Sequence, residues 1–270
     1  MTSNDKVFAG SIPELYDRLL VPLIFESYAR DLASRVAAIK PDNLLETAAG
    51  TGVVTRALAA ALPSTTTMTV TDLNQPMLQQ ATSKQPPGRP IKWQQADALA
   101  LPFKDEGFDA VVCQFGAMFF PDKTKGYSEA RRVLKKNGRF FFSVWDRISE
   151  NEFAEVITEA LARLFPDDPP RFLARTPHGY FDIEQIKREL VAAGFTRITA
   201  DVQTARSRAA SPRDPAIAYC HGTPLRSEIE ARDPAGLERA TNVASDAIAA
   251  RFGNGAVDGR IGALIITATK

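Results

Sequence analysis

The sequence predicts an α/β protein with a doubly wound, mostly parallel β-sheet. Short apolar segments alternate with helical runs between residues 44 and 144, which is the pattern of βαβ units with helices on both faces of a sheet. A turn of small residues ending in Gly50-Thr51-Gly52 separates the first strand from the following helix. An acid, Asp72, closes the next apolar segment, 20 residues after Gly52. Together these observations indicate the fold class.

The chain preceding the first strand is predicted to be helical. Residues 13–39 carry apolar side chains at roughly helical spacing, which predicts one or two amphipathic helices bent at Pro22. A turn at residues 41–43 then leads into the first strand. The extreme N-terminus, Met1 to Lys6, is polar and lacks the apolar stretch of a signal peptide.

The central elements follow from apolar runs and their punctuation. The run Leu134–Gly138 predicts a helix C-terminus, with lysines facing the helix dipole and Gly138 in the left-handed cap position. The predicted strands are Leu44–Ala48, Thr67–Thr71, Ile91–Gln95, Phe108–Gln114 and Arg139–Val144. The predicted helices between them are Val53–Leu62, Pro76–Ser83 and Lys125–Leu134.

The C-terminal part has fewer clear signals. Acids and prolines at 166–170 interrupt one more helix within 147–180. Asp182 precedes Gln185 by three residues, which predicts a capping box for a helix at Ile183–Ala193 that Gly194 ends. The remaining predicted elements are a strand at Phe195–Thr204, mostly helical structure at 205–256 and a strongly β-prone strand at Ile261–Thr269.

Composition excludes several classes of protein. Apolar residues make up 44% of the chain and charged residues 24%, as in ordinary globular proteins, and the net charge of +1 gives no electrostatic case for a nucleic-acid or anionic-membrane partner. No apolar run approaches the ~18 residues of a membrane span. Cys113 and Cys220 lie far apart in unlike contexts, which indicates neither a disulfide framework nor a metal site. We therefore expect a cytoplasmic protein.

The glycine turn and Asp72 predict an adenosine-type ligand, with the acid on the ribose hydroxyls. A dinucleotide fingerprint would place a third small residue where Thr55 stands, and this counts against a nicotinamide cofactor. Glu46 precedes the turn within the strand. A third segment, Gln95–Phe103, follows the third strand and completes the set.

These segments together resemble the class I S-adenosylmethionine-dependent methyltransferases, in particular the small-molecule branch that contains the quinone-biosynthetic enzymes. The resemblance is specific from about residue 40 to 146, looser over 180–204 and the final strand, and nearly absent over 147–180 and 205–256. The matching segments are Leu45–Gly52, Thr71–Leu78, Asp97–Leu99, Leu101–Phe103, Phe108-Asp109 and Glu129–Arg139.

The resemblance implies a Rossmann-like methyltransferase fold over residues 1–270, with seven strands of which the last is antiparallel. Residues 1–40 would form an N-terminal helical cap, and 205–256 a helical lid inserted before the last strand. The implied cofactor is S-adenosylmethionine. Its sulfonium and ammonium suit acids at two strand ends, and its carboxylate suits the positive helix N-terminus near Val53.

The resemblance also assigns cofactor contacts. Each acid has a structural alternative: Glu46 as a buried hydrogen-bonded acid, Asp72 as a helix N-cap ahead of Pro76, and Asp97 as a turn residue. The implied contacts are Ala48, Gly50 and Gly52 under the methionine part with Glu46 beneath the loop, Asp72 on the ribose, Leu73 and Met77 on the adenine face, Asp97 and Ala98 at the adenine edge, and Gln114 beside the methionine.

Catalytic chemistry is less visible in the sequence. Methyl transfer from a sulfonium is an in-line displacement in which positioning and desolvation can supply most of the rate, so a general base is not obligatory. His221, within the expected lid, is the candidate base, whereas His178 is interpreted as a loop residue. The candidates for acceptor contact are Phe119, Tyr219 and His221, and ordinary core packing is the alternative for the aromatic residues.

We therefore expect methylation of a small-molecule acceptor at carbon or oxygen. The fourth strand is followed by Gln114-Phe115-Gly116 and not by an Asn/Asp-Pro-Pro-Phe/Tyr sequence, which argues against amine methylation of adenine, cytosine or glutamine. Two alternatives stay open: a non-catalytic S-adenosylmethionine-binding regulatory or scaffold protein, and a nicotinamide-dependent oxidoreductase. We expect no nucleic-acid partner and no metal, and the sequence leaves the oligomeric state open.

Overall fold

The computed structural model describes residues 12–270, so the interpretation of Met1 to Lys6 lies outside the described part. Contacts divide the chain into two compact units. The unit that we call the sheet unit comprises Glu26–Val144, Phe181–Gln203 and Ala263–Lys270. The other, which we call the helical unit, comprises the chain up to Phe25, Trp145–Tyr180 and Thr204–Gly262.

A seven-stranded mixed sheet in the order β3-β2-β1-β4-β5-β7-β6 confirms the predicted fold class, with the last strand antiparallel. Strands β1 to β5 form a continuous parallel block, in which β1 pairs with both β2 and β4. The strands are β1 (Asn43–Glu46), β2 (Thr67–Asp72), β3 (Ile91–Gln95), β4 (Phe108–Gln114), β5 (Leu134–Trp145), β6 (Arg197–Ala209) and β7 (Val257–Thr269).

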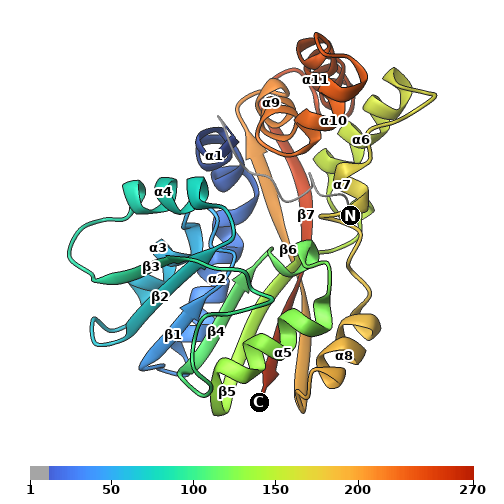
Figure 1. The fold of residues 1–270 in the computed structure, drawn as a ribbon. Coiled ribbons are helices and arrows are strands. Elements are labelled where there is room, and N and C mark those ends of the chain that lie inside the picture. The colour runs from blue at the N-terminus through green and yellow to red at the C-terminus, as the bar shows by residue number, and fades with distance from the viewer. Residues whose placement is uncertain (1–11) are drawn as a thin grey trace. The chain divides into compact units, whose positions relative to one another are not determined.

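The strand order explains why helices cover both faces of the sheet. The chain moves outward from β1 to β3 and then returns to the other side of β1 at β4. Since crossovers between parallel strands are right-handed, this reversal puts α3 (Val53–Ala61) and α4 (Gln75–Lys84) on one face and α5 (Lys123–Val133) on the other. The helix α2 (Glu26–Ala37) packs with α3, and α8 (Ile183–Ala192) packs with α5 (Figure 1).

The core of the sheet unit lies around β4. Its residues Ala110, Val111, Val112 and Cys113 are all fully buried, as expected of a central parallel strand covered on both faces. Phe140 and Phe142 of β5 stack with centroids 4.8 Å apart. At the sheet edge β3 is only partly buried, in keeping with its alternating polar residues.

The helical unit contains most of the remaining helices. Pro22 lies inside a π-helical segment, whose irregular hydrogen bonding accommodates a residue without an N–H. Among residues 12–270, no helix combines the length and apolar character needed to cross a membrane. The helices of the helical unit are α1 (Ile12–Leu15), η2 (Tyr16–Phe25), η4 (Ile148–Glu150), α6 (Glu152–Leu164), α7 (Phe172–Arg175), α9 (Arg213–His221), α10 (Leu225–Arg232) and α11 (Leu237–Phe252).

The predicted helix end at Leu134–Gly138 is wrong in its details. Helix α5 ends at Val133, and β5 begins at once with Leu134. The left-handed residue is Asn137, with φ 63°, and not Gly138. Glycine is needed at 138 because a Cβ there would lie 2.9 Å from the Lys135 carbonyl oxygen. The turn is therefore a bend within β5. Its polar sequence resembles that of a helix cap, which is why a helix end was predicted there.

The predicted N-terminus of α8 is present, although only half of the capping box forms. The Asp182 carboxylate accepts hydrogen bonds from the backbone N–H groups of Glu184, at 2.9 Å, and Gln185, at 3.1 Å. The Gln185 side chain donates instead to Glu189, 3.0 Å away. Gly194 follows the helix with φ 92°, as its position predicts.

One ion pair fixes the long connection between β3 and β4. The Arg132 guanidinium donates two hydrogen bonds to Glu129, each 2.8 Å long. It also donates to the carbonyl oxygens of Leu101, at 2.9 Å, and Phe103, at 2.7 Å, while Glu129 accepts from the Leu101 N–H at 2.8 Å. These contacts lower the pKa of Glu129, with the Arg132 hydrogen bond as the largest cause. Two segments of the resemblance are thus joined by a structural clamp.

We expect Glu129→Gln to lower the free energy of unfolding by about 1–2 kcal/mol at pH 7, because it removes the charge from a bidentate, partly buried pair. Since folding lowers the pKa of Glu129, its contribution is complete above the unfolded-state pKa and is lost as the pH falls through the folded-state value. Urea unfolding at neutral and acid pH measures this difference. The control is Glu159→Gln, at an exposed acid of α6. A difference that does not shrink at acid pH would contradict the assignment.

Candidate functional site

The loops after β1 and β4 leave adjacent strand ends toward opposite faces, which is where open α/β sheets bind ligands. Ala48 in the first loop and Phe115 in the second have positive φ angles of 52° and 50°. Such left-handed conformations cost L-residues roughly 1–2 kcal/mol each. Gly116 makes the meeting of the loops possible, because a Cβ there would collide with Ala48 and lie 2.8 Å from the Cys113 sulfur.

The backbone of the glycine loop is held from both sides. The Thr47 N–H donates to the Val112 carbonyl on β4 at 2.8 Å, and the Ala49 N–H donates to the Thr71 carbonyl on β2 at 3.0 Å. Gly50, with φ 57°, has open space where a Cβ would stand. Gly52, with φ 82°, instead allows close packing, since a Cβ there would lie 3.0 Å from the Cβ of Ala81 on α4. Gly50 therefore leaves open space beside the backbone of the loop, whereas Gly52 allows α4 to pack closely against it.

Asp72 lies at the end of β2 with its side chain oriented by two backbone amides. One carboxylate oxygen accepts from Gly50 at 2.8 Å and the other from Asn74 at 2.7 Å. Burial raises the pKa of Asp72, and the amides of Asn74 and Gly50 act in the opposite direction. The N-cap of α4 is Asn74, so Asp72 is not the helix cap of the alternative interpretation. Its oxygens keep further lone pairs for hydroxyl donors.

Glu46 lies beneath the loop at the end of β1 and is 2% exposed. The Thr55 hydroxyl donates a hydrogen bond of 2.7 Å to its Oε2 atom. Burial raises the pKa of Glu46 to about 8. The sequence analysis uses Thr55 only as evidence against a dinucleotide fingerprint. It did not predict the hydrogen bond between Thr55 and Glu46. A hydroxyl-bearing residue in the first turn after the glycines was the available signal.

The side of the site next to β3 carries an exposed apolar residue. Leu73 is 43% exposed, whereas Met77 on α4 is buried. Gln95, the last residue of β3, donates from its amide to the Leu73 carbonyl at 2.8 Å. The Asp97 side chain accepts from the Leu99 N–H at 2.9 Å, which is the contact that the alternative interpretation as a turn residue describes, and its predicted role at the adenine edge stays a prediction. Ala98 follows it and is half-buried.

Two buried polar atoms near the loop have no hydrogen-bond partner among residues 12–270: the Thr51 hydroxyl oxygen and Oε1 of Gln114. Thr51 belongs to the glycine loop and Gln114 ends β4, the neighbour of β1. An amino-acid group offers the complementary partners, because its ammonium donates and its carboxylate accepts. The open side of Gly50, the exposed Leu73 and these atoms fit the adenosyl and methionine parts of S-adenosylmethionine.

The candidates for acceptor contact are divided between the two units. Phe119 lies in η3 (Ala117–Phe119) of the sheet unit, whereas Tyr219 and His221 lie on α9 of the helical unit. Burial raises the pKa of Tyr219. The His221 Nε2 atom is 2.9 Å from the Thr241 hydroxyl oxygen, and that hydroxyl donates to Leu237, so His221 is the donor. Its Nδ1 is then the basic atom.

His178 is in a loop, as interpreted, but it is 5% exposed. Its Nδ1 donates to the Asp146 carbonyl at 2.9 Å, which leaves Nε2 as the unprotonated ring nitrogen. Burial lowers the pKa of His178 to about 4, so it is neutral at pH 7. Both cysteines are free and buried. No cluster of three potential metal ligands occurs within residues 12–270.

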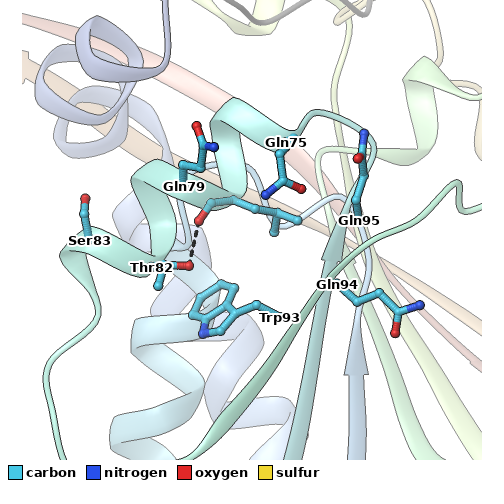
Figure 2. A pocket seen from close by; sticks show the side chains of 8 residues that line it. Gln75, Gln79, Thr82, Ser83, Trp93, Gln94 and Gln95 are labelled. Carbon is cyan, nitrogen blue, oxygen red and sulfur yellow. Dashed lines mark hydrogen bonds between the residues drawn. The ribbon is translucent and has the colours of Figure 1, made fainter.

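A separate cavity of about 380 Å³ lies between α4 and β3. Figure 2 shows Trp93 reaching from β3 beneath the helix, while Gln94 points away from it. The cavity has no charged side chain in its lining and contains none of the predicted site residues. Its lining consists of Gln75, Leu78, Gln79, Thr82, Ser83, Trp93, Gln94 and Gln95.

Comparisons with known proteins agree with this geometry. A family model described as a methyltransferase domain matches residues 45–142. A ubiquinone/menaquinone biosynthesis C-methyltransferase of Ectopseudomonas mendocina is 29% identical over 210 residues, 73% of this chain and 76% of that protein. A demethylmenaquinone methyltransferase of Thermus thermophilus is 31% identical over 196 residues, 68% of this chain and 87% of that protein.

Solved structures show the same fold. A protein of Bacillus halodurans described as a putative methyltransferase has a TM-score of 0.58 at 20% identity, covering 90% of this chain and 99% of its own. A [4+2]-cyclase, SpnF, has a TM-score of 0.56 at 19% identity, covering 91% and 81%. The fold alone therefore does not determine the reaction. The chain belongs to the class I S-adenosylmethionine-dependent methyltransferases and acts on a small molecule, with S-adenosylmethionine as its cofactor.

Proposed function

We propose that this methyltransferase methylates a ring carbon of a small hydroquinone-like acceptor. The observation that carries this proposal is the similarity to relatives named as ubiquinone/menaquinone biosynthesis C-methyltransferase and demethylmenaquinone methyltransferase, which extends over most of each relative. Carbon methylation is one of the two outcomes that the sequence favours. A hydroquinone is a suitable acceptor because an ionised ring hydroxyl places electron density on the neighbouring ring carbons.

We propose cofactor roles for the residues that the structure brings together around the glycine loop. Asp72 would accept hydrogen bonds from the ribose hydroxyls with lone pairs that Gly50 and Asn74 leave free. Leu73 would cover the adenine face, which its 43% exposure in the structure supports. Gln114 would accept from the ammonium group. The remaining proposed contacts are Glu46, Ala48, Gly50, Gly52, Met77, Asp97 and Ala98.

When bound, the cofactor supplies a methyl group on a sulfonium: the acceptor carbon would attack this methyl carbon in line, and the sulfur would leave as a neutral thioether. We propose that the residues around the glycine loop serve to position this group and to exclude water, since the methyl carbon on the sulfonium needs no further activation. His221 remains the proposed proton acceptor, through Nδ1. Phe119 and Tyr219 remain proposed acceptor contacts.

Other expectations remain predictions. These are the roles of residues 1–40 as a cap and 205–256 as a lid, the cytoplasmic location and the lack of a nucleic-acid partner. The balanced charge of the whole chain, +1, supports the last of them.

We expect Asp72→Asn to weaken cofactor binding by at least about tenfold, because an amide loses the charge and presents N–H groups to the donors of Gly50 or Asn74. Isothermal titration calorimetry with S-adenosylmethionine measures the change. Asp246→Asn, at an exposed position of α11, is the matched control and should bind like the wild type. Equal affinity of the Asp72 variant, with an unchanged melting temperature, would exclude the ribose role.

The acceptor proposal predicts formation of the demethylated cofactor with a simple hydroquinone and a product with a new carbon-bound methyl group. The dimethyl ether of the same ring should not react, because its oxygens cannot ionise. Nuclear magnetic resonance of the product distinguishes the attachment atom. A methoxy product would show oxygen methylation, and no turnover across hydroquinones despite cofactor binding would contradict the proposed acceptor class.

A further inference from the structure

Two neighbouring strands of the sheet unit each carry, near their ends, a buried polar side chain whose oxygen has no hydrogen-bond partner. Gln114, the last residue of β4, is 9% exposed, and Ser143, near the end of β5, is fully buried. Oε1 of Gln114 and Oγ of Ser143 find no partner among residues 12–270, so they do not bond each other either. A buried polar group without a hydrogen bond costs free energy, and two of them together call for an explanation.

The two side chains are direct neighbours on one face of the sheet. Gln114 and Ser143 are register partners in the parallel pairing of β4 with β5. Paired residues of adjacent strands carry their side chains on the same face, and the strands are about 4.8 Å apart. The Ser143 carbonyl also accepts the Phe115 N–H at 3.0 Å, which ties the loop after β4 to this point. A single ligand atom can therefore reach both groups.

The strand order indicates which ligand would meet Ser143. Glu46 on β1 pairs with the residue two positions before Asp72 on β2 and with the residue two positions before Gln114 on β4. Asp72, Gln114 and Ser143 therefore lie on one row across the sheet. Ser143 is three strand spacings from Asp72, about 14 Å, since adjacent strands are about 4.8 Å apart. The proposed cofactor contacts run from the ribose at Asp72 to Gln114, so a group that reaches Ser143 belongs to the acceptor.

The chemistry of the two groups selects a hydroxyl. Oε1 of Gln114 only accepts hydrogen bonds, whereas the Ser143 hydroxyl has a hydrogen to donate. A ligand hydroxyl can donate to the first group and accept from the second, so it satisfies both at once. A carboxylate cannot donate to Gln114, and an ammonium cannot accept from Ser143. Neither charged end of the amino-acid part of the cofactor completes the pair.

We propose that Ser143, together with Gln114, determines acceptor specificity by binding a neutral ring hydroxyl of the methyl acceptor. The inference deepens the proposed function and rests on it, because a hydroquinone carries two hydroxyls, of which one is held here while the other ionises. Oε1 of Gln114 has two lone pairs, so it can accept from this hydroxyl and from the ammonium of the cofactor.

The acceptor ring also has suitable neighbours in the sheet unit. Phe115 follows Gln114 directly, and the ring of Tyr28 on α2 meets the Phe115 ring edge-on, with centroids 5.4 Å apart. Aromatic rings associate favourably in edge-to-face and offset arrangements. A planar acceptor would pack beside these rings while its hydroxyl is held between the two strand ends.

The test is calorimetric titration of the full chain, saturated with the demethylated cofactor, with hydroquinone and with para-xylene, in which methyl groups replace the hydroxyls. Ser143→Ala should weaken hydroquinone binding by about two- to tenfold, because the ring hydroxyl loses a buried donor. It should leave para-xylene binding and S-adenosylmethionine binding unchanged. The effect is thus confined to a ligand with a hydroxyl.

The matched control is Ser207→Ala. Ser207 on β6 is also fully buried in a strand, and its hydroxyl also has no partner among residues 12–270. Its replacement should leave hydroquinone binding unchanged. Alanine at either position removes a polar group that makes no hydrogen bond, so neither variant should melt at a lower temperature than the wild type. The comparison is therefore independent of misfolding.

The outcomes separate this inference from the proposed function. Equal hydroquinone affinity in the wild type and Ser143→Ala would overturn the inference, while hydroquinone turnover by the wild type would leave the proposed function intact. Weaker S-adenosylmethionine binding by Ser143→Ala, with unchanged hydroquinone affinity, would assign the hydroxyl to the cofactor and also overturn it. A wild type that neither binds nor methylates hydroquinones would contradict both.

Discussion

The hydrogen bond from the Gly50 N–H to the Asp72 carboxylate, 2.8 Å long, is the interaction on which the arrangement of the site depends. It joins the loop after β1 to the end of β2, two strands that are already paired over their whole common length. The second oxygen of the same carboxylate holds the Asn74 N–H at the start of α4. One side chain thus fixes both the glycine loop and the start of the next helix, and these two hydrogen bonds orient its carboxylate.

The site also contains backbone conformations that the surrounding packing must stabilise. Ala48 and Phe115 adopt left-handed conformations that L-residues avoid, and they occur at the ends of the two strands where the sheet reverses its direction of growth. Hydrogen bonds from the preceding Thr47 to β4 and from Phe115 to β5 hold these loops in place. Such strain concentrates where a structure is over-determined by its neighbours, often at functional sites. The conformation of Gly50 was predictable from residue type, whereas those of Ala48 and Phe115 depend on tertiary contacts and were not.

Much of the fold was predictable because the local signals agree with each other. Strand β4 contains an uninterrupted apolar run, Ala110 to Cys113, and β1, β2 and β4 are each followed by a loop and a helix, so pattern and topology point to the same answer. The bend in β5 was missed because Lys135 to Asn137 are polar and follow a helix, as a helix cap would. The division into two units was not predictable either, because it depends on contacts between segments far apart in the sequence. The acceptor contacts could not be predicted with the same precision, because the segments that carry them lack a recognisable sequence pattern.

Thr55 shows that a residue which departs from a known sequence motif can have a structural role of its own. A glycine or alanine there would serve helix packing around a pyrophosphate, so Thr55 argues against a dinucleotide. The structure adds a positive reason, because a small residue would leave the buried Glu46 without its hydroxyl donor. An unpartnered buried carboxyl costs on the order of 1–3 kcal/mol, so the acid at the strand end and the hydroxyl in the helix are useful only together. We propose that this buried acid favours a cofactor that carries positive charge over a pyrophosphate at the glycine loop of this chain.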